Sequence, residues 1–187
     1  MARLPYPDPS EMSPAVRRSY DAFPKKLNIV RMMAHLGECY TPLFQLGGAI
    51  LTKQKLSPRL RELAILRVAK ATGAGYEWTQ HAPIAIACGA TDEQVEALER
   101  GDVVADCFGA GERNVLAFCD ELIDHTRPDD ETLAAVSSFL SHQEVLELTL
   151  TVGFYQLMAQ LMETSGIESE PSGGDETIRM LREGGLS

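Results

Sequence analysis

The segment from His142 to Ser165 constrains the fold more than any other, because it has a helical pattern and is apolar on nearly every side. Its apolar residues are Val145, Leu146, Leu148, Leu150, Val152, Phe154, Tyr155, Leu157, Leu161 and Met162. A helix of this kind has to be buried all round. We therefore predict an all-α fold in which this helix lies at the centre of the domain or against another subunit.

Helix boundaries are clearly marked along the rest of the chain. A hydroxyl residue before a proline is typical of a helix start, since the N–H that proline lacks would be unpaired there. These pairs are Ser13-Pro14, Thr41-Pro42 and Ser57-Pro58. Capping boxes are expected at Thr91-x-x-Gln94 and Ser141-x-x-Glu144. With the apolar spacing, these signals predict helices at 14–23, 28–38, 42–53, 58–72, 76–88, 92–100, 111–126, 129–140 and 142–165, and a short one at 175–183. No segment alternates apolar and polar residues, so no sheet is expected.

The chain length of 187 residues fits one domain. We expect a single domain over 1–187, with an N-terminal arm at 1–13 and a C-terminal tail at 167–187. The arm is polar and proline-rich and has no apolar core of a signal peptide. No apolar run reaches the roughly 18 residues of a membrane helix, so a cytoplasmic protein is expected.

The net charge of the chain makes nucleic acids and anionic membranes unexpected as binding partners. The chain carries a net charge of −10 and has a pI of about 4.8. An acidic surface repels phosphate backbones and anionic lipids, so neither nucleic acid nor membrane is an expected partner. The four cysteines, Cys39, Cys88, Cys107 and Cys119, form no C-x-x-C pair and match no metal motif. We interpret them as reduced thiols that are mostly buried.

The candidate chemistry lies in the predicted hairpin of helices 58–72 and 76–88. Glu77 and His81 are four residues apart, so they lie on one helix face. A carboxylate one turn away can accept the imidazole N–H, fix its tautomer and prepare it for proton transfer. Antiparallel packing would bring Arg67 and Glu62 to the same groove. The alternative is that Glu77 and His81 form a surface pair, with Glu62 and Arg61 simply solvated.

A family resemblance favours the chemical interpretation. The run Arg61-Glu62-x-x-Ile65-Leu66-Arg67, then Tyr76-Glu77-Trp78-x-x-His81, then Ala85, Gly89 and Thr91-Asp92-Glu93 resembles the core of the carboxymuconolactone decarboxylase family. The resemblance covers residues 56–98. It implies a compact helical bundle of the alkylhydroperoxidase D-like type that forms homo-oligomers, commonly trimers or hexamers, through long apolar helices.

The family has two chemical branches, and the motif distinguishes them. The alkylhydroperoxidase D-like branch uses a glutamate, a C-x-x-C pair and a histidine. Here the glutamate and histidine correspond to Glu62 and His81, but the two cysteine positions hold Ala74 and Glu77. The other branch decarboxylates a lactone acid without a cofactor, using a glutamate followed four residues later by a histidine. This sequence is most similar to an uncharacterised subgroup with the Tyr-Glu-Trp-x-x-His form.

The resemblance to the second branch implies cofactor-free decarboxylation or isomerisation of a small lactone or keto acid. His81 would be the acid and base, Glu77 its orienting partner or a second acid, and Glu62 a supporting group. Arg67 would hold the substrate carboxylate or pair with a glutamate. Tyr76 and Trp78 are further substrate-binding candidates, with core or interface packing as the alternative for Trp78. No metal and no cofactor are expected.

Two other functions stay open. One is a thiol-dependent peroxidase, which would need Cys88 or another thiol near His81. The other is a non-catalytic oligomeric binding protein, in which the charged residues form a buried network that fixes the hairpin.

Overall fold

The computed structural model describes residues 1–172, which are helical without strands. Its α-helices are α1 (Pro14–Ala22), α2 (Asn28–Met32), α3 (Tyr40–Lys53), α4 (Pro58–Thr72), α5 (Gly75–Ala87), α6 (Asp92–Arg100), α7 (Ala110–His125), α8 (Asp130–Ser137) and α9 (His142–Ser165). Two 3-10 helices, η1 (Pro9–Glu11) and η2 (Met33–Cys39), complete this part of the chain. The all-helical prediction is confirmed for these residues. The helix predicted at 175–183 lies outside them.

Several helix starts follow the local signals. The Ser13 hydroxyl accepts the Val16 N–H at the start of α1. The predicted capping boxes form at the starts of α6 and α9. The prediction at Thr41-Pro42 is wrong, because α3 begins at Tyr40, two residues before the predicted first residue, Pro42. Helix η2 leads directly into α3, so the Tyr40 N–H bonds back to the carbonyl of Gly37 and no cap is needed.

The predicted helix at 28–38 is divided in two. Helix α2 ends at Met32, and the chain continues as η2, in which Gly37 has a φ of 57°. This left-handed conformation suits glycine and interrupts regular helical hydrogen bonding. Helix α8 also ends earlier than predicted, at Ser137 instead of residue 140.

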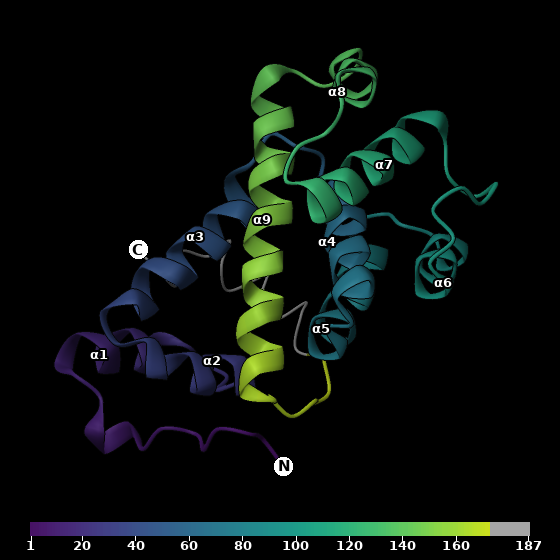
Figure 1. The fold of residues 1–187 in the computed structure, drawn as a ribbon. Coiled ribbons are helices and arrows are strands. Elements are labelled where there is room, and N and C mark those ends of the chain that lie inside the picture. The colour runs from purple at the N-terminus through teal and green to yellow at the C-terminus, as the bar shows by residue number, and fades with distance from the viewer. Residues whose placement is uncertain (173–187) are drawn as a thin grey trace.

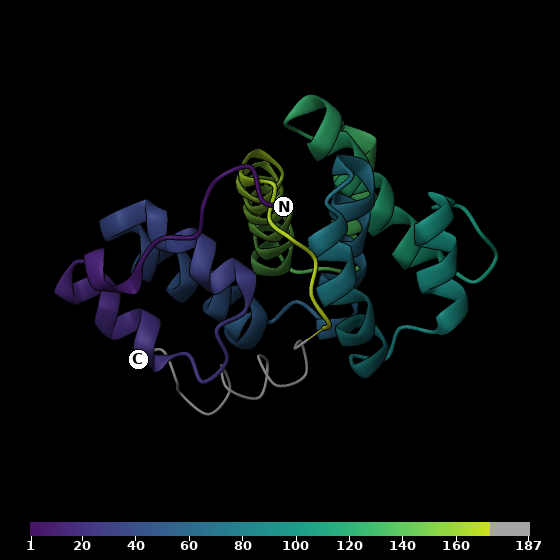
Figure 2. The ribbon, with the colours of Figure 1, turned by 90° about the horizontal axis from the view of Figure 1, so that it is seen from below.

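Helix α9 stands between two groups of helices (Figure 1). Seen from below, α1 to α3 lie on one side of it and α4 to α7 on the other (Figure 2). Helix α4 packs against α9, α5 and α7, and its segment Arg61–Leu66 is buried throughout. The site therefore sits where α4, α5 and α9 meet the N-terminal helices.

Burial of α9 is incomplete within one chain. Leu146, Leu150 and Leu157 are 69%, 44% and 44% exposed. Together with the exposed Gly153, they recur at helical spacing and form an apolar stripe along one face. The part of the prediction that placed the helix wholly inside the domain is therefore wrong, and contact with another subunit stays a prediction.

The length and hydropathy of α9 differ from the prediction that no segment is long and apolar enough for a membrane helix. Among residues 1–172 it is the one helix long and apolar enough to span a membrane, with a mean hydropathy of 1.2. Half of that apolar window is buried inside the fold, as in the core helix of a soluble protein.

The α4–α5 hairpin is closed by a left-handed glycine. Gly73 has a φ of 71°, and the N–H of Ala74 bonds back to the carbonyl of Ala69. This pattern ends α4 sharply, and α5 begins two residues later, packed against α4. One face of α5 is thereby set against the buried Arg61 and Glu62.

Candidate active site

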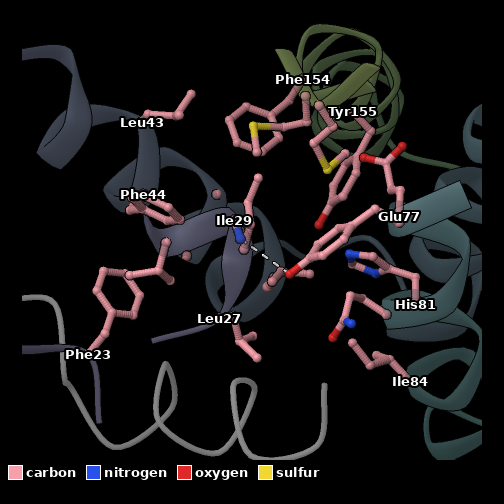
Figure 3. Close-up of a pocket in the computed structure, with 18 of the residues that line it drawn as sticks. Phe23, Leu27, Ile29, Leu43, Phe44, Glu77, His81, Ile84, Phe154 and Tyr155 are labelled. Atoms are coloured by element: carbon pink, nitrogen blue, oxygen red, sulfur yellow. Dashed lines mark hydrogen bonds between the residues drawn. The ribbon is translucent and has the colours of Figure 1, made fainter. Parts of the chain in front are cut away.

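A cavity of about 130 Å³ lies between the N-terminal helices, α5 and α9 (Figure 3). Most of its wall is apolar. Phe23, Leu27, Ile29, Leu43, Phe44 and Phe154 are among the residues that form this wall. An apolar cavity with a few convergent polar groups is the usual form of a small-molecule site.

Helix α5 supplies most of the polar groups of the cavity. Glu77, Gln80 and His81 follow one another at helical spacing, so they share one face of α5 with Tyr76 at its edge. Tyr155 enters from α9. The structure therefore brings the predicted residues Tyr76, Glu77 and His81 to one cavity, and Figure 3 shows Glu77 and His81 there.

His81 is bound by a carboxylate from the neighbouring helix. Its Nδ1 atom lies 2.8 Å from Oε2 of Glu62. The Arg61 Nε–H donates to the other oxygen, Oε1, at 3.1 Å. Glu62 is fully buried and Arg61 is 2% exposed, so the negative charge is paired inside the protein, as buried charges require. The solvated alternative for Arg61 and Glu62 is wrong.

This arrangement fixes the imidazole. A carboxylate can only accept, so the Nδ1–H of His81 donates to Glu62, and in the neutral ring Nε2 is then the acceptor. The ring also packs edge-on against Tyr155, with centroids 4.9 Å apart and planes at 88°. Glu62, not Glu77, therefore holds the imidazole, which differs from the predicted division of roles.

Glu77 is buried without a partner. It is 2% exposed, and neither carboxyl oxygen has a hydrogen bond among the described residues. Burial raises the pKa of the Glu77 carboxyl well above its usual range, and the charge of Glu163 raises it further. The protonated, uncharged form of Glu77 is thereby favoured.

Tyr155 lies between these groups and is kept uncharged. Burial raises the pKa of the Tyr155 phenol well above its usual range, and the nearby carboxylate of Glu62 adds to the shift. Its ring packs against Phe154 as well as His81. Tyr155 was not predicted from the sequence, where it belonged only to the apolar pattern of α9.

The segment after α9 joins two walls of the cavity. The Tyr76 hydroxyl donates to Oε1 of Glu170 at 2.7 Å and accepts the Ile29 N–H at 3.3 Å. The Gln80 side-chain amide donates to the carbonyl of Glu170 at 3.2 Å. Burial raises the pKa of Tyr76, and the hydrogen bond to Glu170 adds to the shift. Glu170 was missed because it lies in a segment with no helical pattern.

Two predicted substrate-binding residues lie elsewhere. The Arg67 Nε–H donates to Oδ1 of Asp120 on α7, and Arg67 is not among the residues that line the cavity. Trp78 packs on a separate cluster that contains Leu63 and Leu66. It points away because it follows Glu77 by one position, about 100° round the helix.

Thiols are also placed away from the cavity. All four cysteines lie within residues 1–172, and none lines it. Cys119 is buried, and burial raises the pKa of its thiol, which opposes thiolate formation. Residues 1–172 also contain no group of three or more histidine, cysteine, aspartate or glutamate side chains that could bind a metal ion.

Solved structures of the same fold cover nearly the whole chain. An uncharacterized peroxidase-related protein from Ralstonia eutropha JMP134, with an alkylhydroperoxidase AhpD core, is 17% identical, with 97% of this chain and 96% of that chain covered and a TM-score of 0.77. An uncharacterized peroxidase-related protein from Silicibacter sp. TM1040 is 14% identical, with 90% of each chain covered and a TM-score of 0.72. A cysteine-to-alanine variant of the debrominase Bmp8, in complex with 2,3,4-tribromopyrrole, is 15% identical, with 97% and 100% covered and a TM-score of 0.71.

These identities establish the fold alone. No curated protein matches the sequence. The model of the carboxymuconolactone decarboxylase family matches residues 38–121, which include α4, α5 and both members of the Glu62–His81 pair. This part of the chain therefore matches the carboxymuconolactone decarboxylase family, and the described residues have an alkylhydroperoxidase D-like fold.

Proposed function

We propose that this protein transfers protons to and from carbon in a small cyclic carbonyl compound, with His81 as both acid and base. The observation that carries the proposal is the 2.8 Å contact between Nδ1 of His81 and Glu62 at the wall of the cavity. It leaves Nε2 as the basic nitrogen of a ring that lines the cavity.

Two reactions use this arrangement. In an isomerisation, Nε2 takes a proton from the carbon beside the carbonyl, the C–H electrons pass to the carbonyl oxygen, and the proton returns to another carbon. In a decarboxylation, the bond to the carboxylate breaks, carbon dioxide leaves, and protonated His81 delivers a proton to carbon. In both, the Glu62 carboxylate stabilises the imidazolium. A positioned acid or base typically contributes about 10²–10⁴-fold to the rate.

The thiol peroxidase alternative has less support. A peroxidase of this fold would need a reactive thiolate beside His81, and the corresponding positions hold Ala74 and Glu77. Cys88 ends α5 but does not line the cavity. We therefore favour proton transfer over thiol chemistry.

We also propose that the chain forms a homo-oligomer through α9. The stripe of Leu146, Leu150, Gly153 and Leu157 is exposed in one chain. An exposed apolar stripe of this kind favours contact with a second protein surface. The family resemblance favours trimers or hexamers of this chain.

The function can be tested with two lactones of different charge. α-Angelica lactone is uncharged and isomerises to the β form, whereas 4-carboxymuconolactone is anionic and releases carbon dioxide. The His81→Gln variant should lose about 10²-fold or more in kcat on whichever lactone the wild type turns over. The matched control is His142→Gln, at an exposed position at the start of α9, which should keep the wild-type rate. Turnover that persists in His81→Gln would refute the proposal.

A further inference from the structure

We propose that the cavity selects an uncharged single-ring ligand whose carbonyl oxygen accepts a hydrogen bond from the Glu77 carboxylic acid. The inference rests on the proposed function and narrows it. A decarboxylase has to bind a carboxylate, whereas an isomerase can act on an uncharged lactone or cyclic ketone. Glu77 would then be the group that decides which of the two reactions the site performs.

The cavity offers no buried cation that is free to bind a carboxylate, among the described residues. A carboxylate inside the cavity would lie close to Glu77 and would need a positive partner. Arg61 is occupied by Glu62, and Arg67 by Asp120. Lys25 is the one lysine or arginine that lines the cavity within residues 1–172. It is exposed, so its hydrated ammonium is a weak partner for a buried anion.

The carboxyl group of Glu77 is available to bind a ligand. Both oxygens of Glu77 are buried and lack a hydrogen bond among the described residues, although buried polar groups are nearly always paired. Glu77 lines the cavity beside Tyr155 (Figure 3). A protonated carboxyl has one O–H to donate, and a ligand carbonyl is the acceptor that would complete it. The same bond would stabilise the negative charge that develops on that oxygen during proton transfer.

The size and shape of the cavity suit a single ring. The cavity volume is about 130 Å³, and an apolar cavity of about 150 Å³ is known to hold one benzene ring. Phe23, Phe44 and Phe154 contribute aromatic walls, which pack well against a flat ring. A single ring therefore suits the volume of the cavity, and one carbonyl group on that ring can accept the hydrogen bond from Glu77.

Three probes that share one benzene ring test the effects of charge and of a carbonyl acceptor on binding. Benzamide is uncharged and has a carbonyl acceptor, benzoate has the same outline but is anionic, and toluene has no acceptor. Binding of each to the full-length protein at neutral pH can be measured by calorimetry and by ligand-observed NMR. Wild-type protein should bind benzamide about tenfold or more tightly than benzoate. This comparison shows whether the cavity prefers an uncharged ligand to an anionic one, and it requires no variant.

The variants then test Glu77 itself. Glu77→Gln keeps an N–H donor and should retain benzamide affinity within about threefold. Glu77→Leu removes the donor and should weaken benzamide about tenfold, with toluene binding unchanged. The matched control is Glu99→Leu on the exposed face of α6, which should bind all three probes as the wild type does. Circular dichroism checks that each variant is folded.

Three results would overturn the inference: benzoate binding as tightly as benzamide, no measurable benzamide binding, or an unchanged benzamide affinity in Glu77→Leu. The experiments distinguish failure of the proposed function from failure of the ligand inference. If His81-dependent turnover of 4-carboxymuconolactone is found and benzoate binds as well as benzamide, proton transfer stands and the ligand inference falls. If benzamide is preferred but His81→Gln leaves turnover intact, the ligand inference stands and the catalytic role of His81 falls.

Discussion

The Nδ1 atom of His81 on α5 lies 2.8 Å from Oε2 of Glu62 on α4, and this bond ties the two helices together at the wall of the cavity. Arg61 holds the other oxygen of Glu62, so a buried chain of three side chains runs from the interior to the site. Each member restricts the next, because Glu62 cannot turn without losing either Arg61 or His81. The imidazole is thereby positioned before any ligand binds.

Glu62→Gln should lower kcat about 10²-fold or more on the lactone that the wild type converts, because an amide cannot stabilise the imidazolium as a carboxylate does. Steady-state kinetics at one fixed pH measure this loss. Glu99→Gln, at an exposed position, is the control.

The same variant should be less stable. Neutralising Glu62 leaves Arg61 buried without its charge partner, which costs about 3–5 kcal/mol. Urea unfolding followed by circular dichroism measures this difference. A Glu62→Gln protein with wild-type rate and wild-type stability would contradict the account of this chain of side chains.

Glu77 should make stability fall as pH rises. Its ordinary pKa is 4.5, and burial raises that pKa in the folded protein. Between the two values the folded chain keeps a proton that the unfolded chain has released, so raising the pH favours unfolding by about 1.4 kcal/mol per pH unit. Glu77→Gln has no such proton. Its stability relative to the wild type should increase from about pH 5 to pH 7 in urea unfolding, whereas parallel pH curves would contradict the burial effect.

The hydrogen bond between Tyr76 and Glu170 should stabilise the cavity wall. Tyr76→Phe keeps the ring but removes the hydroxyl that lies 2.7 Å from Glu170, and should lower the free energy of unfolding by about 1.5–3 kcal/mol. A double-mutant cycle with Glu170→Gln isolates the pair. A coupling energy near zero would mean that the segment after α9 does not hold the wall.

The apolar stripe on α9 should mediate self-association. Leu146 is 69% exposed, and Leu146→Glu would place a charge within the proposed interface, where it lacks a partner. The variant should have a smaller mass than the wild type in sedimentation equilibrium, with unchanged helix content. Val104→Glu, at a position 72% exposed in a loop, is the matched control. A wild-type mass for Leu146→Glu would contradict the proposed interface.

Much of the fold could be predicted because its signals are local. The caps at Ser13, Thr91 and Ser141 are satisfied within three residues of each helix start, so no tertiary information is needed. The left-handed Gly73 likewise ends α4 by hydrogen bonds to its own last turn. Thr41 failed as a start signal because its hydroxyl bonds to Ser19 on another helix, a contact that only the fold defines.

The site could be predicted only in part. Spacing placed Glu77 and His81 on one face of α5, and the structure brings both to the cavity. Spacing could not choose the partner of His81, because that choice depends on how α5 is rotated against α4. Arg67 was expected at the groove, yet it faces Asp120 on α7, and the contact of Glu170 with Tyr76 spans 94 residues of sequence.

The tautomer of His81 tests the central claim most directly. Protein labelled with ¹⁵N-histidine can be examined by two-bond ¹H–¹⁵N correlation NMR, with His81→Gln used to assign the signal among the four histidines. The account predicts that neutral His81 carries its proton on Nδ1, leaves Nε2 unprotonated, and loses this preference in Glu62→Gln. A neutral His81 that carries its proton on Nε2 in the wild type would contradict it, because the ring nitrogen at the cavity could then not accept a proton from a substrate.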